Sequence, residues 1–287
     1  MLKEDLHRHP LDVVTACRAA DLQVLGLTFT ALKKQVPMRR LRVITARSNF
    51  AKCRRVLGEE SELIDEDTFI PGMTLKEISR LTLPGFPQGA GWYFQQLLKL
   101  QFSFVRPEEE HYLIWDADTV PLRPMEFFDE NGAMLLTIAD EEHPPYFDNY
   151  RKLLGEEPQR ECSFIAQHIV VRKAIVREML GSIEARHAGN EQWAWKIMRN
   201  LEGTHVNLLS EYELVGHYTK NHYPAEVRFR RLPWLREGTQ TVGGRPSAKQ
   251  LETLSHQYAF AAFEAKYRPL RRWMRQMRSW LRPFRPR

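Results

Sequence analysis

The chain has 287 residues, of which 43% are hydrophobic and 27% charged. This composition excludes a disordered or fibrous chain and suffices for one large domain or two small ones with a sizeable core. The net charge of +6 is uneven, because nine of the 42 basic residues and no acidic residue lie in 266–287, which leaves 33 basic against 36 acidic residues elsewhere. A body without basic excess argues against nucleic acid as a partner, and we expect none.

Cysteine usage and hydropathy indicate the compartment. The three cysteines, Cys17, Cys53 and Cys162, are far apart and odd in number, which predicts neither a disulfide framework nor a zinc knuckle. The N-terminal residues are polar and lack the apolar centre of a signal peptide. No run approaches the roughly 20 apolar residues of a membrane span. We therefore expect a cytoplasmic protein.

The first half of the chain alternates predicted strands and helices. Apolar runs predict strands over 11–17, 41–46, 62–64 and 112–115. Apolar residues spaced three and four apart predict helices over 18–36, 49–57 and 91–103. This rhythm is typical of βαβ units and a parallel sheet.

The second half continues with further strands and helices. We expect strands over 133–138 and 163–171 and an edge strand or irregular segment over 228–237. Helices are expected over 146–155, 173–187 and 190–201, from Ser210, and over the long stretch 247–267. Residues 238–246, GTQTVGGRP, have the composition of a linker. The chain then divides into a body, 1–246, and a C-terminal helix with a basic tail, 247–287.

The segment HYLIWDADTVPLRP, 111–124, is the most informative stretch. A short apolar run ends in Asp116 and Asp118, and Pro121 stops the strand because proline cannot donate to a sheet. Two carboxylates therefore stand at the carboxyl end of a strand, where open α/β sheets bind ligands. Such a pair can share a hard divalent cation, whereas the simpler interpretation is an acidic turn.

Three motifs in this order resemble a bacterial family of GT-A-type glycosyltransferases. They are GWYFQQLLKL at 91–100, WDADTVP at 115–121 and SEYEL at 210–214, and the similarity covers most of 11–225. The resemblance implies an α/β fold of the nucleotide-diphospho-sugar transferase type, a mixed, mainly parallel sheet flanked by helices, with 1–246 as catalytic domain. It also implies a hexosyltransferase-like activity that transfers sugar from a nucleotide sugar, with a UDP-sugar as the expected donor.

In this family the D-x-D motif holds Mn²⁺ or Mg²⁺ against the donor diphosphate. The resemblance makes Asp118 the direct ligand, while Asp116 binds through water or holds the ribose. The family takes a third ligand, often histidine, from the C-terminal half, and His217 and His256 are the candidates. A buried or surface histidine with no metal is the alternative for each.

The donor is expected over the end of the first strand. The switch-point rule places base and ribose at Thr15, Ala16 and Arg18, and Arg47 follows the second strand as a further candidate. Lys99 lies within reach of a diphosphate if its helix faces the site. Only one of Gln167 and His168 faces the cleft, because neighbouring strand residues alternate, and we favour Gln167.

An inverting transferase needs a carboxylate that deprotonates the acceptor hydroxyl. Glu211, Glu213 and Asp140 are the candidates. Ser210 with Glu213 matches a capping box, which makes Glu213 structural and leaves Glu211 as the base. Asp140 follows the strand after the D-x-D motif and could bind either sugar. The expected acceptor is a glycan or a lipid-linked glycan of cell-surface polysaccharide synthesis.

The basic tail has the pattern of an interfacial helix. Leu270, Trp273, Met274 and Met277 follow helical spacing, and arginines fall between them. Tryptophan and arginine in this arrangement suit an anionic membrane surface, so 268–287 predicts a peripheral protein on the inner face of the cytoplasmic membrane. The alternative is a terminal helix packed on the body.

The strand and its aspartates also match the D-x-D-x-T/V pattern of haloacid-dehalogenase-like phosphatases, in which the first aspartate, here Asp116, is the nucleophile. That fold carries the motif on its first strand and needs a lysine further along the chain. Here about 115 residues precede the motif, and the next lysine is Lys152, already beyond the acidic cluster at 140–142. The transferase is therefore the favoured prediction.

Overall fold

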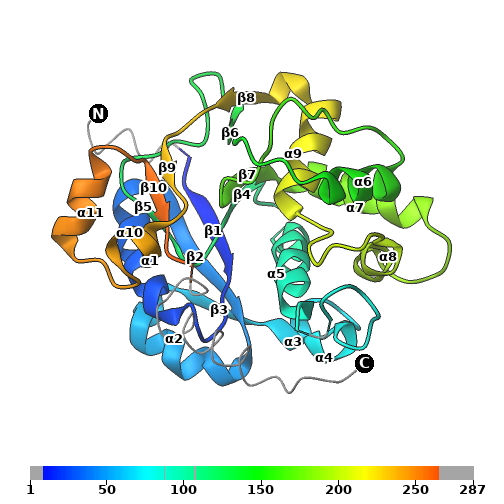
Figure 1. The fold of residues 1–287 in the computed structure, drawn as a ribbon, viewed down its shortest axis with the longest axis horizontal. Helices are drawn as coiled ribbons and strands as arrows, with labels where there is room; N and C mark the ends of the chain where they lie inside the picture. Colours follow the sequence, from blue (N-terminus) through cyan, green and yellow to red (C-terminus); the bar gives the residue numbers. More distant parts are fainter. Residues whose placement is uncertain (1–8, 87, 107, 265–287) are drawn as a thin grey trace, which may run out of the picture.

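The computed structural model describes residues 9–86, 88–106 and 108–264. Its centre is a five-stranded sheet in the order β3-β2-β1-β4-β7 (Figure 1). The strands are β1 (Leu11–Ala16), β2 (Met38–Thr45), β3 (Glu62–Asp65), β4 (His111–Trp115) and β7 (His168–Arg172). β1, β2, β3 and β4 run parallel, and β7 pairs antiparallel with β4. β1 and β4 therefore lie next to each other at the point where the strand order reverses.

Helices cover both faces of this sheet. They are α1 (Leu22–Gln35), α2 (Phe50–Leu57), α3 (Glu66–Phe69), α4 (Leu75–Ile78), α5 (Ala90–Gln101), α6 (Pro144–Leu154), α7 (Lys173–Arg186), α8 (Trp193–Asn200), α9 (Glu211–His222), α10 (Gly238–Val242) and α11 (Ala248–Ser255). In Figure 1, α1 and α2 lie on one side of the sheet, and α5, α6, α7 and α9 on the other. Short 3₁₀ turns at 47–49, 58–60, 102–104 and 224–226 connect them.

Continuous apolar runs explain the central strands. Every residue of β1 is buried, and so are Tyr112–Trp115 of β4, because helices pack on both sides. Parallel strands covered on both faces have this pattern. The predicted fold class, α/β with a mixed, mainly parallel sheet flanked by helices, is confirmed.

Two small sheets stand beside the main one. β5 (Thr119–Pro121), β10 (Phe260–Ala262) and β9 (Trp234–Leu235) form one, and β6 (Met134–Thr137) and β8 (Val227–Arg230) form the other. β5 directly follows the D-x-D motif and pairs antiparallel with β10. The C-terminal part of the described chain thus supports the motif from the side.

The helix predicted over 247–267 is wrong over 256–264, because α11 ends at Ser255, and 265–267 lie outside the described residues. Phe260, Ala261 and Ala262 are fully buried and form β10, because pairing with β5 and β9 outweighs their helical spacing. The supposed linker contains α10, whose Thr239 is buried. The division of the chain at 246/247 remains a prediction.

Two further predictions concern the chain as a whole. The basic tail, 268–287, lies outside the described residues, so its helix and membrane contact stay predictions. No helix within the described part of the chain combines the length and apolar character needed to cross a bilayer. Cys17, Cys53 and Cys162 are all free thiols.

Candidate active site

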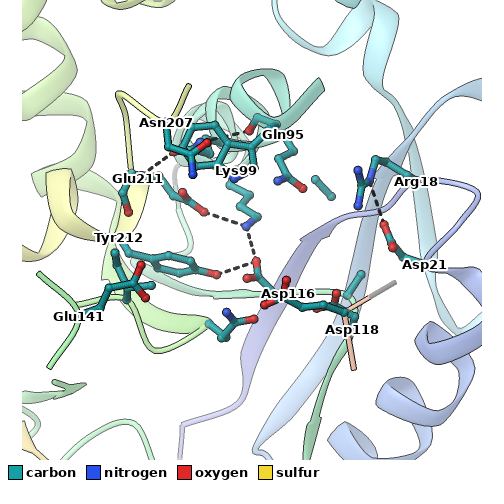
Figure 2. A pocket seen from close by; sticks show the side chains of 18 of the residues that line it. Arg18, Asp21, Gln95, Lys99, Asp116, Asp118, Glu141, Asn207, Glu211 and Tyr212 are labelled. Carbon is teal, nitrogen blue, oxygen red and sulfur yellow. Dashed lines mark hydrogen bonds and ion pairs between the residues drawn. The ribbon is translucent and has the colours of Figure 1, made fainter. Parts of the chain in front are cut away.

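A cavity of about 320 Å³ opens at the carboxyl ends of β1 and β4. Its wall combines segments far apart in sequence: Ala16, Arg18, Asp21, Trp92, Gln95, Gln96, Lys99, Asp116, Ala117, Asp118, Glu141, Tyr146, Ile165, Gln167, Asn207, Ser210, Glu211, Tyr212, Arg236 and Glu264. In Figure 2, Arg18 and Asp21 lie on one side, Asn207, Glu211, Tyr212 and Glu141 on the other, with Asp116 and Asp118 below. The cavity therefore has two flanks that meet at the D-x-D motif.

Backbone hydrogen bonds fix the turn that carries the two aspartates. Thr119 N donates to the Asp116 carbonyl at 3.0 Å, and Phe263 N of the C-terminal segment donates to the Asp118 carbonyl at 2.8 Å. Thr28 of α1 donates its hydroxyl to the Ala117 carbonyl at 3.1 Å. Neighbours on both sides thus hold the turn and leave its carboxylates facing the cavity.

Gln167 holds the same turn from the antiparallel strand. Its φ of +63° is unusual for a residue other than glycine. Its carbonyl accepts from Asp116 N at 3.0 Å, and its side-chain Oε1 accepts from the Thr119 hydroxyl at 3.1 Å. Strand pairing with β4 stops here, so β7 begins at His168 and the predicted 163–171 strand is too long at its start.

A buried ion cluster joins Asp116 to α5 and α9. Lys99 Nζ lies 2.5 Å from Asp116 Oδ1 and 2.8 Å from Glu211 Oε1, and the Tyr212 hydroxyl donates to Asp116 Oδ1 at 2.8 Å. Gln96 Oε1 accepts from Glu211 N at 2.9 Å. Lys99 and Glu211 are both buried, and two helices, α5 and α9, position one carboxylate oxygen of Asp116.

The charges of this cluster shift one another's protonation. Burial lowers the pKa of Lys99, but Asp116 and Glu211 outweigh it and raise that pKa above its usual range. Burial raises the pKa of Glu211, with Lys99 opposing and Asp116 adding to the shift. Burial, followed by the charges of Asp116 and Asp21, raises the pKa of Asp118 to about 8. Acidic side chains also outnumber basic ones in the cavity wall, with six Asp or Glu residues against three Lys or Arg residues.

The residues present fit a divalent ion. Asp118 has no hydrogen bond from the described residues to its carboxylate, and only one oxygen of Asp116 is taken by Lys99 and Tyr212. Hard carboxylate oxygens suit Mn²⁺ or Mg²⁺. Within the described residues, no three His, Cys, Asp or Glu side chains are arranged to hold an ion. The protein would thus contribute two carboxylates, and a bound ligand and water would supply the rest.

The two glutamates of α9 face different surroundings. Ser210 accepts from Glu213 N, as the predicted cap requires, but the Glu213 carboxylate does not return to Ser210. It accepts from Phe164 N at 3.0 Å and from the Ser163 hydroxyl at 2.6 Å. Glu213 thereby ties α9 to the segment before β7, and Glu211 alone turns to the cavity.

The structure brings most of the predicted site residues together. Seven of them line the cavity: Ala16, Arg18, Lys99, Asp116, Asp118, Gln167 and Glu211. Gln167 faces the cavity, and His168 lies behind it, buried and stacked on Trp115 at a ring distance of 4.9 Å. The cavity therefore receives Gln167, as predicted, although Gln167 lies just before β7 and not within a strand.

Five other candidates lie elsewhere. Thr15 is buried outside the cavity wall, Arg47 is exposed near Asp65, and Asp140 is exposed and bonded to Arg231. His217 is fully buried among Phe147, Tyr150 and Phe164, with Nε2 3.1 Å from Glu213. His256 is exposed at the end of α11. None of the five lines the cavity as described.

Several residues of the cavity wall were not predicted as site residues from the sequence. Asp21, Trp92, Gln95, Tyr146 and Tyr212 are among them. Trp92, Gln95 and Tyr212 belong to the recognised motifs, so their position on helix faces gave a usable signal. Asn207, Arg236 and Glu264 come from loops, and only the folded chain shows that they face this cavity.

The chain belongs to the family DUF6492, described as a family of unknown function, whose model matches residues 10–243. No curated protein matches it. Among solved structures it is similar to an active-site mutant of LgtC, with 12% identity, 94% of this chain and 96% of that chain covered, and a TM-score of 0.49. Mouse xyloside xylosyltransferase 1, in its apo form, gives 13% identity, 88% and 97% coverage and a TM-score of 0.46.

A third similar structure is the galactosyltransferase LgtC in complex with donor and acceptor sugar analogs, with 13% identity, 94% and 92% coverage and a TM-score of 0.44. These three structures are of two proteins, a xylosyltransferase and a galactosyltransferase by their descriptions. At these identities and scores the likeness concerns the general arrangement of the chain, and the chemistry proposed below is drawn from the cavity.

Proposed function

We propose that this protein is a metal-dependent glycosyltransferase of the GT-A type that takes its sugar from a nucleotide sugar. One observation carries the proposal. Asp116 and Asp118 present carboxylate oxygens that have no partner among the described residues to a cavity at the carboxyl ends of β1 and β4. A site with surplus negative charge at that edge suits a divalent cation with a bound diphosphate.

Asp118 and the remaining oxygen of Asp116 would hold Mn²⁺ or Mg²⁺. When bound, the ion would neutralise the diphosphate that leaves the sugar. Lys99 and Tyr212 both bond to Oδ1 of Asp116, which orients the side chain and leaves its other carboxylate oxygen for the ion. Ala16 and Arg18 at the end of β1 would bind the nucleoside, a UDP-sugar being our expected donor, and Gln167 would contact its sugar or phosphate. Thr15, Arg47 and His217 do not line the cavity, so we assign them no role in binding the donor or the ion.

Glu211 is our proposed base for the acceptor hydroxyl. It is the carboxylate of α9 that lines the cavity, and burial raises its pKa toward the range of a working base. Lys99, 2.8 Å from Glu211 Oε1, keeps that carboxylate in position. Asp140 is exposed and bonded to Arg231, so it is the weaker candidate. Substitution Glu211→Gln should retain nucleotide binding and abolish transfer.

The basic tail, 268–287, is the basis of our proposal for the location of the enzyme in the cell. We propose that 268–287 holds the enzyme on the inner face of the cytoplasmic membrane, where a lipid-linked or cell-surface glycan is extended. Removal of 268–287 should move the protein from the membrane to the soluble fraction on sedimentation. Retention in the membrane fraction after that removal would refute the anchor and leave the transferase proposal unaffected.

A thermal-shift screen of the full chain tests the proposed activity. Melting temperatures are measured with UDP-, GDP- and CMP-sugars, each with Mn²⁺ and with a chelator. We expect a rise for one nucleotide class that disappears without metal, because a ligand that binds only the folded state stabilises it. Absence of any shift contradicts the proposal. Metal-dependent hydrolysis of p-nitrophenyl phosphate would instead support the phosphatase that uses Asp116 as nucleophile.

A further inference from the structure

The flank of the cavity opposite Arg18 is built differently from the donor flank. Trp92 of α5 and Tyr146 of α6 line it with nearly parallel rings, 6.3 Å apart between centroids and tilted by 22°. Tyr93 meets Trp92 edge-on at 4.9 Å, and His143 meets Tyr146 edge-on at 4.3 Å. Packing on both sides thus fixes the orientation of these two rings.

Uncharged polar groups surround these rings. The side chains of Gln95 and Asn207 reach the cavity, and neither side chain takes part in a hydrogen bond within the described chain. Asn207 is held through its backbone, whose carbonyl lies 2.9 Å from His143 Nε2. Figure 2 shows Asn207 at one edge of the cavity and Gln95 between Asn207 and Arg18. These amides are therefore available to a ligand.

We propose that this flank, made of Trp92, Tyr146, Gln95 and Asn207, binds the acceptor as a neutral pyranoside. A pyranose ring has an apolar C–H face that packs on an aromatic plane, and hydroxyls at its edge that pair with amides. Glu141 and Glu211 lie on this side of the cavity, Glu141 being paired with Arg236, and these two carboxylates disfavour an acidic sugar. The inference rests on the proposed function, because it supplies that reaction with its acceptor.

Direct binding of methyl glycosides to the full chain tests this subsite without a donor. The probes are methyl glucoside, methyl galactoside, methyl mannoside and methyl glucuronide, followed by saturation-transfer NMR. We expect binding of at least one neutral glycoside and weaker binding of the glucuronide. Substitution Trp92→Ala should weaken that binding about tenfold, since a stacked ring contributes on the order of the free energy of a tenfold change.

Controls separate loss of the subsite from loss of the fold. Trp195→Ala removes another partly exposed tryptophan, which bonds to Gly72 and lies outside the cavity, and should leave glycoside binding unchanged. Asn207 is exposed, so Asn207→Ala should fold normally and also weaken binding. Unchanged affinity in both Trp92→Ala and Asn207→Ala would overturn the proposal, as would preference for the glucuronide.

Thermal shifts with UDP and Mn²⁺ on the same preparations distinguish the two proposals. Nucleotide binding with no glycoside binding refutes this subsite and leaves the transferase standing. Glycoside binding that depends on Trp92, with no nucleotide binding, supports a sugar site and refutes the proposed function.

Discussion

The two ends of the central sheet both carry buried charges, but they are balanced differently. At the amino end, Asp12 of β1 is fully buried and accepts from Arg39 and Arg42, each at 2.9 Å. At the carboxyl end, Asp116 is held through one oxygen, and Asp118 has no bond from the described residues to its carboxylate. Asp12 is thus satisfied by the protein, whereas Asp116 and Asp118 keep carboxylate oxygens that have no partner among the described residues.

This difference separates stability from function along a single sheet. A buried carboxylate with two guanidinium partners has no free oxygen for a ligand. Removing one member of such a buried ion pair destabilises the fold. Carboxylates that repel one another in an open cavity cost stability until a cation arrives. Aspartate thus stabilises the fold at the amino end of the sheet and, as we propose, binds the divalent ion at the carboxyl end.

The largest expected effect is on ligand binding at the carboxyl end. Substitution Asp118→Asn should abolish Mn²⁺-dependent nucleotide binding, because it removes the carboxylate that has no protein partner. Isothermal titration calorimetry with UDP and Mn²⁺ measures it. Asp67→Asn, an exposed aspartate outside the cavity, serves as the matched control and should bind as the wild type does. Normal sugar transfer by Asp118→Asn would show that the site is misplaced.

The next effect is on stability at the amino end. Substitution Asp12→Ala leaves buried Arg42 without its main partner and should reduce the free energy of unfolding by about 3 kcal/mol. Urea denaturation measures that loss. Nucleotide affinity of the folded fraction should stay the same. A loss of nucleotide affinity in a folded Asp12→Ala protein would mean that the two ends are coupled.

The neighbouring glutamates of α9 repeat the comparison on a smaller scale. Substitution Glu213→Ala leaves the buried Phe164 N–H without its acceptor, so unfolding should become easier by about 2 kcal/mol. Thermal and urea unfolding report it. Glu211→Gln, in contrast, should change transfer far more than stability. Equal loss of stability in the two variants would contradict the division of roles between them.

A further expected effect is a pH dependence of stability in the metal-free protein. The pKa of Asp118 is raised from its ordinary 3.8 to about 8, so the folded state holds a proton that the unfolded state has released. Stability from this group is therefore present at low pH and declines as pH rises from about 4 to about 8. Unfolding measured over this range should show a steeper decline in the wild type than in Asp118→Asn, because the raised pKa values of Glu66 and Glu211 still contribute in the variant. Equal pH dependence in both proteins would contradict the shift.

Local patterns predicted the central elements well because local forces decide them. The apolar runs at β1 and β4 are buried, as their sequences require. The prediction failed for Phe260–Ala262, whose helical spacing is overridden by pairing with β5. Glu213 fulfils only half of its predicted capping box, because Phe164 N and Ser163 compete for its carboxylate.

By itself the sequence determined the strands, the helices between them and the D-x-D motif that follows β4. It also indicated Lys99 and Glu211 as candidates, because they lie in recognisable motifs. Only the tertiary structure decided that these two side chains meet Asp116, that His217 is enclosed by aromatic rings, and that Trp92 and Tyr146 share one wall. The reason is physical: periodicity and capping act over a few residues, whereas the cavity joins segments more than 200 residues apart through packing.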